Sequence, residues 1–291
     1  AQKSENKDIE KIPAEKNTFG KGSGNADRSQ NKRDHVKAPG EYAKIMLPEL
    51  TFPYLIPGQE VLLDDGKIHL KIVEKAENVT ENGGENTQEK RYFAKVLWGG
   101  LLKSRKSAAL PGAKIYPPTL TNSDLANIKI AKEMGVTGVM QPFVRDHSDL
   151  ERVKEALREA GAEDIRLFAK IENMDGVRKL EKLLPAADEI VIARGDLGNA
   201  VHLWDLPGVQ RQISEKCRAA GKPFMVVTQM LASMERSPVP TRAEVNDIFH
   251  AVMDGAASIM VTGETAVGDY PVEVIRYMVN TVRSAEKEEN R

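Results

Sequence analysis

The sequence predicts an α/β protein with a parallel sheet, preceded by a small β-rich module. From Pro111 onward, short apolar runs alternate with amphipathic segments of helical period, as in the strand–helix units of a parallel sheet. Between about residues 43 and 107, shorter runs alternate polar and apolar residues around turn signals, as in antiparallel hairpins. Residues 1–42 are polar and lack apolar periodicity, so we expect a flexible or irregular segment there. The expected parts are therefore 1–42, 43–107 and 108–291.

Composition limits the classes of partner. The chain has 291 residues, enough for one large and one small domain, and a formal net charge of -1. This balance gives no electrostatic reason to expect nucleic acid or a membrane surface as a partner. Cys217 is the single cysteine, which excludes an internal disulfide framework, and no apolar run approaches the ~18 residues of a membrane span. We expect a soluble, cytoplasmic protein.

Two hairpins are predicted in the β-rich module. Residues 61–63 and 67–73 flank a tight Asp-Gly turn, where Asp64 and Asp65 are expected as turn formers rather than ligands. A second hairpin is expected at about residues 91–101. The module is therefore predicted to be mostly antiparallel.

About five strand–helix units follow the module. The predicted strands lie at 136–140, 165–168, 189–192, 224–227 and 259–261, and the main helices follow at 148–160, 176–184, 209–219, 241–252 and 271–287. A closed (β/α)8 barrel needs eight strands and typically ~250 residues, whereas only about 180 follow the module. Either three strands are absent from this chain, or the sheet is open, or the polar N-terminal segment hides further elements.

Charged residues stand where two neighbouring strands are predicted to end. Lys170 and Glu172 follow the run 165–168, and Asp196 follows the run 189–192. The carboxyl ends of parallel strands share one rim, which is where α/β proteins place their chemistry. Two carboxylates there could hold a hard divalent cation, and a lysine could meet a developing negative charge. The alternative is that all three are solvated loop charges.

Several of these strand ends belong to longer motifs. In order and spacing they resemble the pyruvate kinase family over about residues 50–285: Lys170-Ile-Glu-Asn, Ala193-Arg-Gly-Asp-Leu-Gly, Thr228-Gln-Met-Leu, Pro240-Thr-Arg-Ala-Glu-Val-Asn-Asp and Gly263-Glu-Thr-Ala. The resemblance implies a TIM barrel of which about five units are present, with residues 43–107 as the β-rich lid domain. The segment Gly198-Asn-Ala, with Leu203-Trp-Asp-Leu-Pro after it, resembles short bacterial members that lack a C-terminal regulatory domain.

The resemblance also implies roles for individual residues. Glu172 and Asp196 match the family's Mg²⁺ (or Mn²⁺) ligands, which bridge the ion to phosphoenolpyruvate. Lys170 matches the lysine that neutralises charge on the transferred phosphoryl group and the enolate, and Thr228 the threonine implicated in proton delivery. Gly195 and Asp196 would offer backbone N–H groups to the substrate carboxylate. The reaction implied is phosphoenolpyruvate plus ADP giving pyruvate plus ATP.

Three further residues match with less specific roles. Lys106 matches a lid lysine near the nucleotide phosphates of ADP or ATP, and Thr262 and Glu264 match the active-site rim. Each also has a purely structural interpretation.

Parts of the family pattern are not found. The first three barrel strands of the family supply an arginine for the substrate phosphate and the ligands of a monovalent cation such as K⁺, and no counterpart precedes Tyr42. Pro142 stands where the family has serine. The chain is therefore a fragment, or a second copy or other chain completes it, or it no longer catalyses. The alternatives are a metal-dependent 2-oxo-acid lyase using Glu172 and Asp196, and an inactive scaffold or complex subunit.

Overall fold

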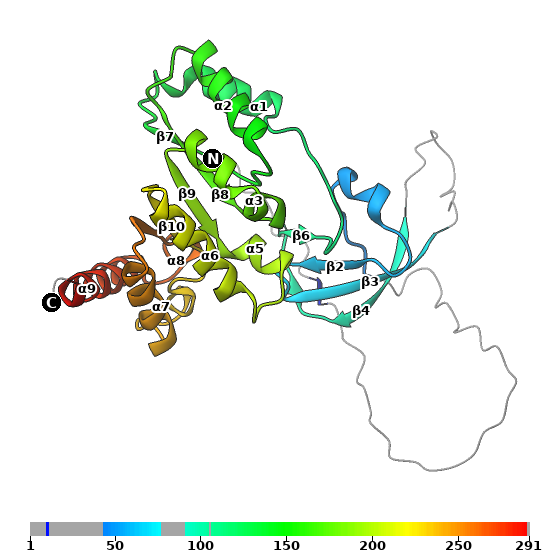
Figure 1. Ribbon diagram of the computed structural model, residues 1–291. Coiled ribbons are helices and arrows are strands. Elements are labelled where there is room, and N and C mark those ends of the chain that lie inside the picture. The colour runs from blue at the N-terminus through cyan, green and yellow to red at the C-terminus, as the bar shows by residue number, and fades with distance from the viewer. Residues whose placement is uncertain (1–9, 12–42, 77–90, 105, 290–291) are drawn as a thin grey trace, which may run out of the picture. The chain divides into compact units, whose positions relative to one another are not determined.

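A computed structural model describes residues 10–11, 43–76, 91–104 and 106–289 (Figure 1). The chain divides into two compact units, Ala1–Ile115 and Tyr116–Arg291. Apart from Glu10 and Lys11, which form a short strand, the polar segment predicted at 1–42 lies outside the described residues.

The N-terminal unit is built around an antiparallel four-stranded sheet of order β4-β3-β2-β6. Its described elements are β1 (Glu10–Lys11), the 3-10 helix η1 (Glu49–Tyr54), β2 (Glu60–Leu63), β3 (Ile68–Lys75), β4 (Tyr92–Trp98), β5 (Leu101–Leu102) and β6 (Ala108–Ala109). The first predicted hairpin is confirmed, because β2 pairs with β3 in antiparallel register. Its turn uses left-handed backbone at Asp64 (φ 49°) and Asp65 (φ 56°), which aspartate tolerates better than most residues.

The second predicted hairpin is wrong. Strand β4 pairs with β3, and β5 pairs instead with β1, which lies far upstream in the chain. Turn signals report only local reversals, so they cannot reveal a pairing between segments so distant in sequence. The core of this unit comes from the inward faces of β2 and β3, chiefly Val61, Leu63, Ile68, Leu70 and Ile72.

The C-terminal unit contains a five-stranded parallel sheet of order β11-β10-β9-β8-β7. Its strands are β7 (Gly138–Gln141), β8 (Arg166–Ile171), β9 (Glu189–Ala193), β10 (Phe224–Val227) and β11 (Ser258–Met260). This confirms the α/β prediction and the five strand–helix units. Within the described residues β7 and β11 are the end strands, so the sheet there is open rather than closed into a barrel.

Helices precede, connect and follow these strands. They are α1 (Asn122–Ala131), α2 (His147–Glu159), α3 (Met174–Arg178), α4 (Leu180–Leu183), α5 (Arg194–Ala200), α6 (Leu206–Ala219), α7 (Arg242–Met253), α8 (Gly263–Ala266) and α9 (Pro271–Glu289), with short 3-10 helices η2 (Leu184–Ala186) and η3 (Ala232–Glu235). The predicted helix 176–184 is instead two short helices, α3 and α4, separated at Lys179. In the described residues no helix is long and apolar enough to span a membrane.

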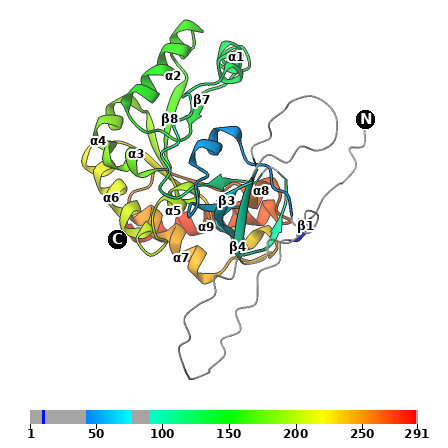
Figure 2. The same ribbon diagram turned by 90° about the vertical axis from the view of Figure 1, so that its right-hand side faces the viewer.

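Alternate residues of the central strands face two different hydrophobic clusters. Leu167, Ile190 and Val226 belong to the large cluster formed with the helices. Val191 and Met225 belong to a smaller cluster made by the strands alone. Because side chains alternate along a strand, these clusters lie on opposite faces of the sheet. Figure 2 shows α2, α4 and α6 side by side along the helical face.

Candidate functional site

The Lys170–Glu172 pair lies at the carboxyl end of β8. Lys170 is inside the strand and Glu172 follows its last residue, so the two side chains leave the same face of the strand. Lys170 Nζ lies 2.7 Å from Glu172 Oε1. The Glu172 side chain is 2% exposed and that of Lys170 is 25% exposed. A buried carboxylate is thus paired with a lysine whose side chain is partly exposed.

A second set of contacts fixes Glu172 from the neighbouring strand. The backbone N–H of Phe143, which has left-handed φ of 51°, donates to Glu172 Oε2 at 2.7 Å. Asn173 donates from Nδ2 to the Val144 carbonyl at 3.2 Å and accepts from the Gly176 N–H at 2.8 Å, capping α3. A Cβ at Gly176 would lie 2.6 Å from the Val144 carbonyl oxygen, so only glycine fits. The ends of β7 and β8 are therefore tied together.

Gly195 and Asp196 occupy the first turn of α5, which begins directly after the fully buried strand β9. Backbone N–H groups in the first turn of a helix have no acceptor within the helix. Strand β9 lies beside β8 in parallel register, so Asp196 and Glu172 follow the ends of adjacent strands. This is the arrangement that the sequence predicts for the two carboxylates.

Thr228 follows the last residue of β10 in an unusual backbone conformation. Its φ is 83° and that of Gln229 is 57°. Left-handed backbone is disfavoured for a β-branched residue and costs about 1–3 kcal/mol, so its surroundings must hold it there. A Cβ at Gly195 would lie 3.1 Å from Thr228 Cγ2, which places the predicted threonine and the predicted glycine in close contact.

Arg194 is a residue to which the sequence analysis gave no role. Its Nε and Nη2 donate to the Thr228 carbonyl at 3.2 and 2.7 Å, and its Nη1 to Asp247 Oδ2 at 2.6 Å. Its side chain is 13% exposed. The sequence could have indicated this residue, because an arginine directly after a buried apolar strand needs partners for its charge. Which residues serve as partners is decided by the fold.

Thr262 and Glu264 lie after β11. Glu264 is buried, and its carboxylate accepts from the Thr262 N–H at 2.7 Å and the Leu231 N–H at 3.2 Å. Glu264 thereby joins the segments that follow β10 and β11. The sequence did not predict this connecting role.

Lys106 lies in the N-terminal unit, where its Nζ is 2.8 Å from Asp64 Oδ1. Burial alone would raise the pKa of Asp64, but the hydrogen bond from Lys106 and the charge of Lys67 outweigh it and hold the pKa below its ordinary value. The ion pair joins the hairpin turn to the segment before β6.

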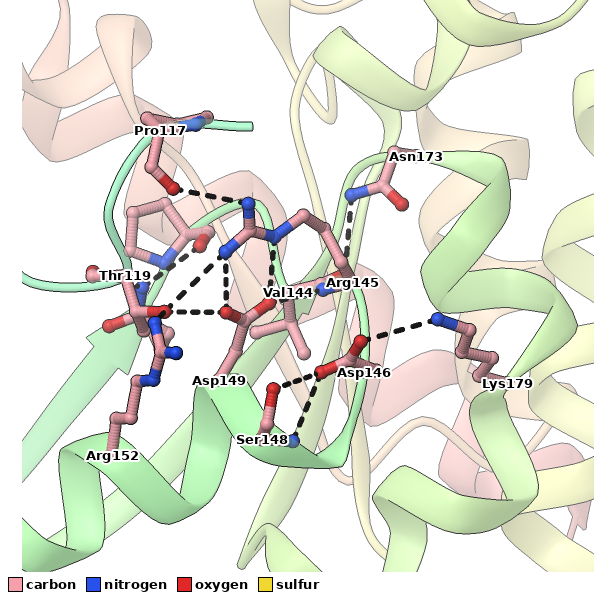
Figure 3. Close-up of polar contacts among 12 residues, drawn as sticks. Pro117, Thr119, Val144, Arg145, Asp146, Ser148, Asp149, Arg152, Asn173 and Lys179 are labelled. Atoms are coloured by element: carbon pink, nitrogen blue, oxygen red, sulfur yellow. Dashed lines mark hydrogen bonds and ion pairs between the residues drawn. The ribbon is translucent and has the colours of Figure 1, made fainter. Parts of the chain in front are cut away.

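A polar cluster that sequence reasoning missed surrounds Arg145 and Asp149 (Figure 3). Arg145 donates from Nη2 and Nε to the two Asp149 carboxylate oxygens at 2.6 and 3.0 Å, and from Nη1 to the Pro117 carbonyl at 3.1 Å. Thr119 Oγ1 donates to the same carboxylate at 2.6 Å. Burial would raise the pKa of Asp149, but these hydrogen bonds lower it to about 2. The cluster borders an open pocket of about 530 Å³ that Lys179 also lines.

Metal-binding capacity rests on few residues. Across the described ranges, no group of three or more His, Cys, Asp or Glu side chains could hold an ion. Mg²⁺, however, is commonly held by one or two carboxylates, with substrate oxygens and water completing the shell. Glu172 and Asp196, at adjacent strand ends, have the donor type that such an ion needs.

Comparison with known proteins gives consistent matches. The family model "Pyruvate kinase, barrel domain" matches residues 30–275. Pyruvate kinase from Geobacillus stearothermophilus is 40% identical over 233 residues, covering 79% of this chain and 38% of that protein. Those from Bacillus licheniformis (38% identical, 79% of this chain, 38% of the relative) and Clostridium acetobutylicum (35%, 80% and 47%) are similar. The chain thus spans less than half the length of these curated relatives.

Proposed function

Because this chain belongs to the pyruvate kinase family, we propose that it transfers a phosphoryl group from phosphoenolpyruvate to ADP, giving pyruvate and ATP. The observation that carries the proposal is the Lys170–Glu172 pair at the end of β8, with Asp196 after the adjacent strand β9. A cation and two carboxylates at one rim are what magnesium-dependent phosphoryl transfer requires.

Lys170 supplies a fixed positive charge. Phosphoryl transfer spreads negative charge over the oxygens of a loosely bonded group, so positioned cations lower the barrier. An ammonium has three N–H donors, and Lys170 makes one ion pair among the described residues, to Glu172. Its remaining donors could bind a phosphoryl or enolate oxygen, while Glu172 holds the ammonium in position.

Glu172 and Asp196 would hold Mg²⁺ or Mn²⁺, which when bound neutralises charge on the substrate phosphate. The Glu172 carboxylate is held by Lys170 and Phe143, and Asp196 lies in the first turn of α5. A carboxylate held as Glu172 is loses little freedom when an ion binds. We assign no residue to K⁺.

Thr228 and Gly195 would meet the rest of the substrate. The first-turn N–H groups of Gly195 and Asp196 would bind the substrate carboxylate. Thr228 would pass a proton to the enolate carbon through water, because a threonine hydroxyl is too weak an acid to do so alone. Lys106 is assigned to the nucleotide phosphates, and Thr262 and Glu264 to the rim, by resemblance.

The setting follows from the same proposal. The partners are the small molecules phosphoenolpyruvate and ADP, and the location is the cytoplasm. The assembly is a homo-oligomer or includes a chain that completes the barrel. Neither nucleic acid nor membrane enters the reaction.

The test is pyruvate formation from phosphoenolpyruvate and ADP by the purified chain, with and without Mg²⁺ and K⁺. We expect turnover that needs ADP and Mg²⁺ and that Lys170→Met lowers by about 10²- to 10³-fold. The matched control is Lys179→Met, which also removes a lysine paired with a carboxylate (Asp146, 3.3 Å) in the same unit. Turnover without ADP would favour the lyase alternative, and a folded chain without turnover would favour the scaffold.

A further inference from the structure

We propose that Arg194 is a positioning residue: it holds the turn after β10, and with it Thr228, in the left-handed conformation. The inference rests on the proposed function for the catalytic role of Thr228. The mechanical part, that Arg194 holds the turn, can be measured separately.

The turn needs an external constraint. Thr228 and Gln229 both have positive φ, at 83° and 57°, and neither is glycine. Two successive left-handed residues do not persist by their own backbone preferences. Contacts from outside the turn must therefore fix it.

Arg194 supplies contacts of the required kind. Nε and Nη2 of its guanidinium converge on one acceptor, the Thr228 carbonyl, at 3.2 and 2.7 Å. A charged donor strengthens these hydrogen bonds, and the low exposure of the side chain (13%) limits competition from water. The carbonyl direction is thereby fixed, and it sets the peptide plane between Thr228 and Gln229.

Asp247 orients the guanidinium. Its Oδ2 accepts from Arg194 Nη1 at 2.6 Å, and it belongs to α7, 53 residues away. Arg194 therefore joins the start of α5, the turn after β10 and helix α7. This contact gives a structural role to Asp247, the last residue of the motif Pro240-Thr-Arg-Ala-Glu-Val-Asn-Asp.

Gly195 constrains the same threonine from another side. A Cβ at this position would be 3.1 Å from Thr228 Cγ2, so the glycine backbone lies against the Thr228 methyl group. Arg194 holds the carbonyl and Gly195 limits the side chain. Two consecutive residues thus fix both ends of Thr228.

The first experiment does not depend on turnover. Hydrogen–deuterium exchange is measured for peptides covering residues 226–234 in the unaltered chain, in Arg194→Met and in the control Arg211→Met. Arg211 forms an exposed pair with Glu215 at 2.8 Å, so its change also removes one guanidinium and one ion pair. We expect amide exchange in this turn to become about tenfold faster or more in Arg194→Met only.

The second experiment measures turnover. Arg194→Met should lower kcat for pyruvate formation by about 100-fold while the KM for ADP stays unchanged. Arg194→Lys keeps the charge but lacks the planar guanidinium with its parallel N–H donors. Its kcat should therefore lie between that of the unaltered chain and that of Arg194→Met. The double variant Arg194→Met with Thr228→Ala should be no slower than Thr228→Ala alone, because both changes remove the same contribution.

The outcomes separate the two proposals. Faster exchange in a chain that lacks turnover upholds the role of Arg194 and rejects the proposed function. Unchanged exchange in Arg194→Met overturns the positioning role, as do additive losses in the double variant. If Arg194→Met does not fold, Asp247→Asn and Arg194→Lys are measured in the same way, with smaller effects in the same direction expected.

Discussion

Two ion pairs lie after neighbouring strands of the sheet and are built differently. After β7, the Asp149 carboxylate accepts four hydrogen bonds, two from the Arg145 guanidinium, one from the Arg145 N–H and one from Thr119. At the end of β8, the Glu172 carboxylate has two partners among the described residues, Lys170 and the Phe143 N–H.

The difference separates an anchor from a candidate site. The guanidinium of Arg145 donates to the Asp149 carboxylate, the Pro117 carbonyl and the Thr119 hydroxyl, and it ties the segment 117–119 to α2. Among the described residues Lys170 has one ion-pair partner for its three N–H donors, and its side chain is 25% exposed. A saturated network stabilises a fold, whereas an unsaturated one leaves capacity for a ligand. Four predictions test this comparison.

The largest effect is expected at the unsaturated pair. Lys170→Met should reduce turnover by about 10²- to 10³-fold, because it removes a positioned charge from the transition state. The free energy of unfolding should change less than in Arg145→Met, because Lys170 loses one ion pair whereas the Arg145 side chain loses four hydrogen bonds. Steady-state rates and urea titration on the same sample check both statements. Equal losses of stability in the two variants would contradict the comparison.

Breaking the Arg145–Asp149 pair should lower the free energy of unfolding. Arg145→Met leaves the Asp149 carboxylate, whose side chain is 4% exposed, without its cation, and should cost about 3–5 kcal/mol of unfolding free energy. Urea denaturation measures the loss. The control is Arg158→Met, because Arg158 pairs with Glu155 where both side chains are more than half exposed; it should change stability by less than about 1 kcal/mol. A similar cost for both variants would reject the anchor.

The pH dependence of the anchor has a definite sign. The pKa of Asp149 is lowered from 3.8 to about 2, so its ion pair stabilises the fold above pH 3.8. This contribution, about 1–2 kcal/mol after allowance for solvent screening, should be lost as the pH falls from about 4 to 2. Urea titrations across that range should show a shallower decline in Asp149→Asn than in the unaltered chain. Parallel declines would show that other carboxylates carry the effect.

The smallest effect is expected beside Thr228. Gly195→Ala places a methyl group 3.1 Å from Thr228 Cγ2, so the threonine must shift, and turnover should fall about tenfold. Adding Thr228→Ser removes that Cγ2 methyl and should restore part of the rate lost to the alanine, relative to Thr228→Ser alone. Steady-state rates of the three variants check this. An unchanged rate in Gly195→Ala would show that the contact does not position Thr228.

The sequence by itself determined the parallel sheet and the family. Buried parallel strands read as continuous apolar runs, and all five predicted runs became strands of one sheet. The motifs at the ends of these runs indicated the pyruvate kinase family, which the family model and the relatives confirm. Because side chains two residues apart leave the same face of a strand, the pattern also brought Lys170 and Glu172 together at the end of β8.

Only the tertiary structure decided which distant groups meet. Arg194 meets Asp247 across 53 residues, Thr119 meets Asp149 across 30, and β5 pairs with β1 rather than with its neighbour β4. The periodicity of apolar residues predicts which residues of a helix or strand are buried. It does not predict how one element is aligned against another. That alignment follows from packing the helices on the sheet, and it gives the Arg145 guanidinium partners on two segments, whereas the partner of Lys170 among the described residues lies on its own strand end.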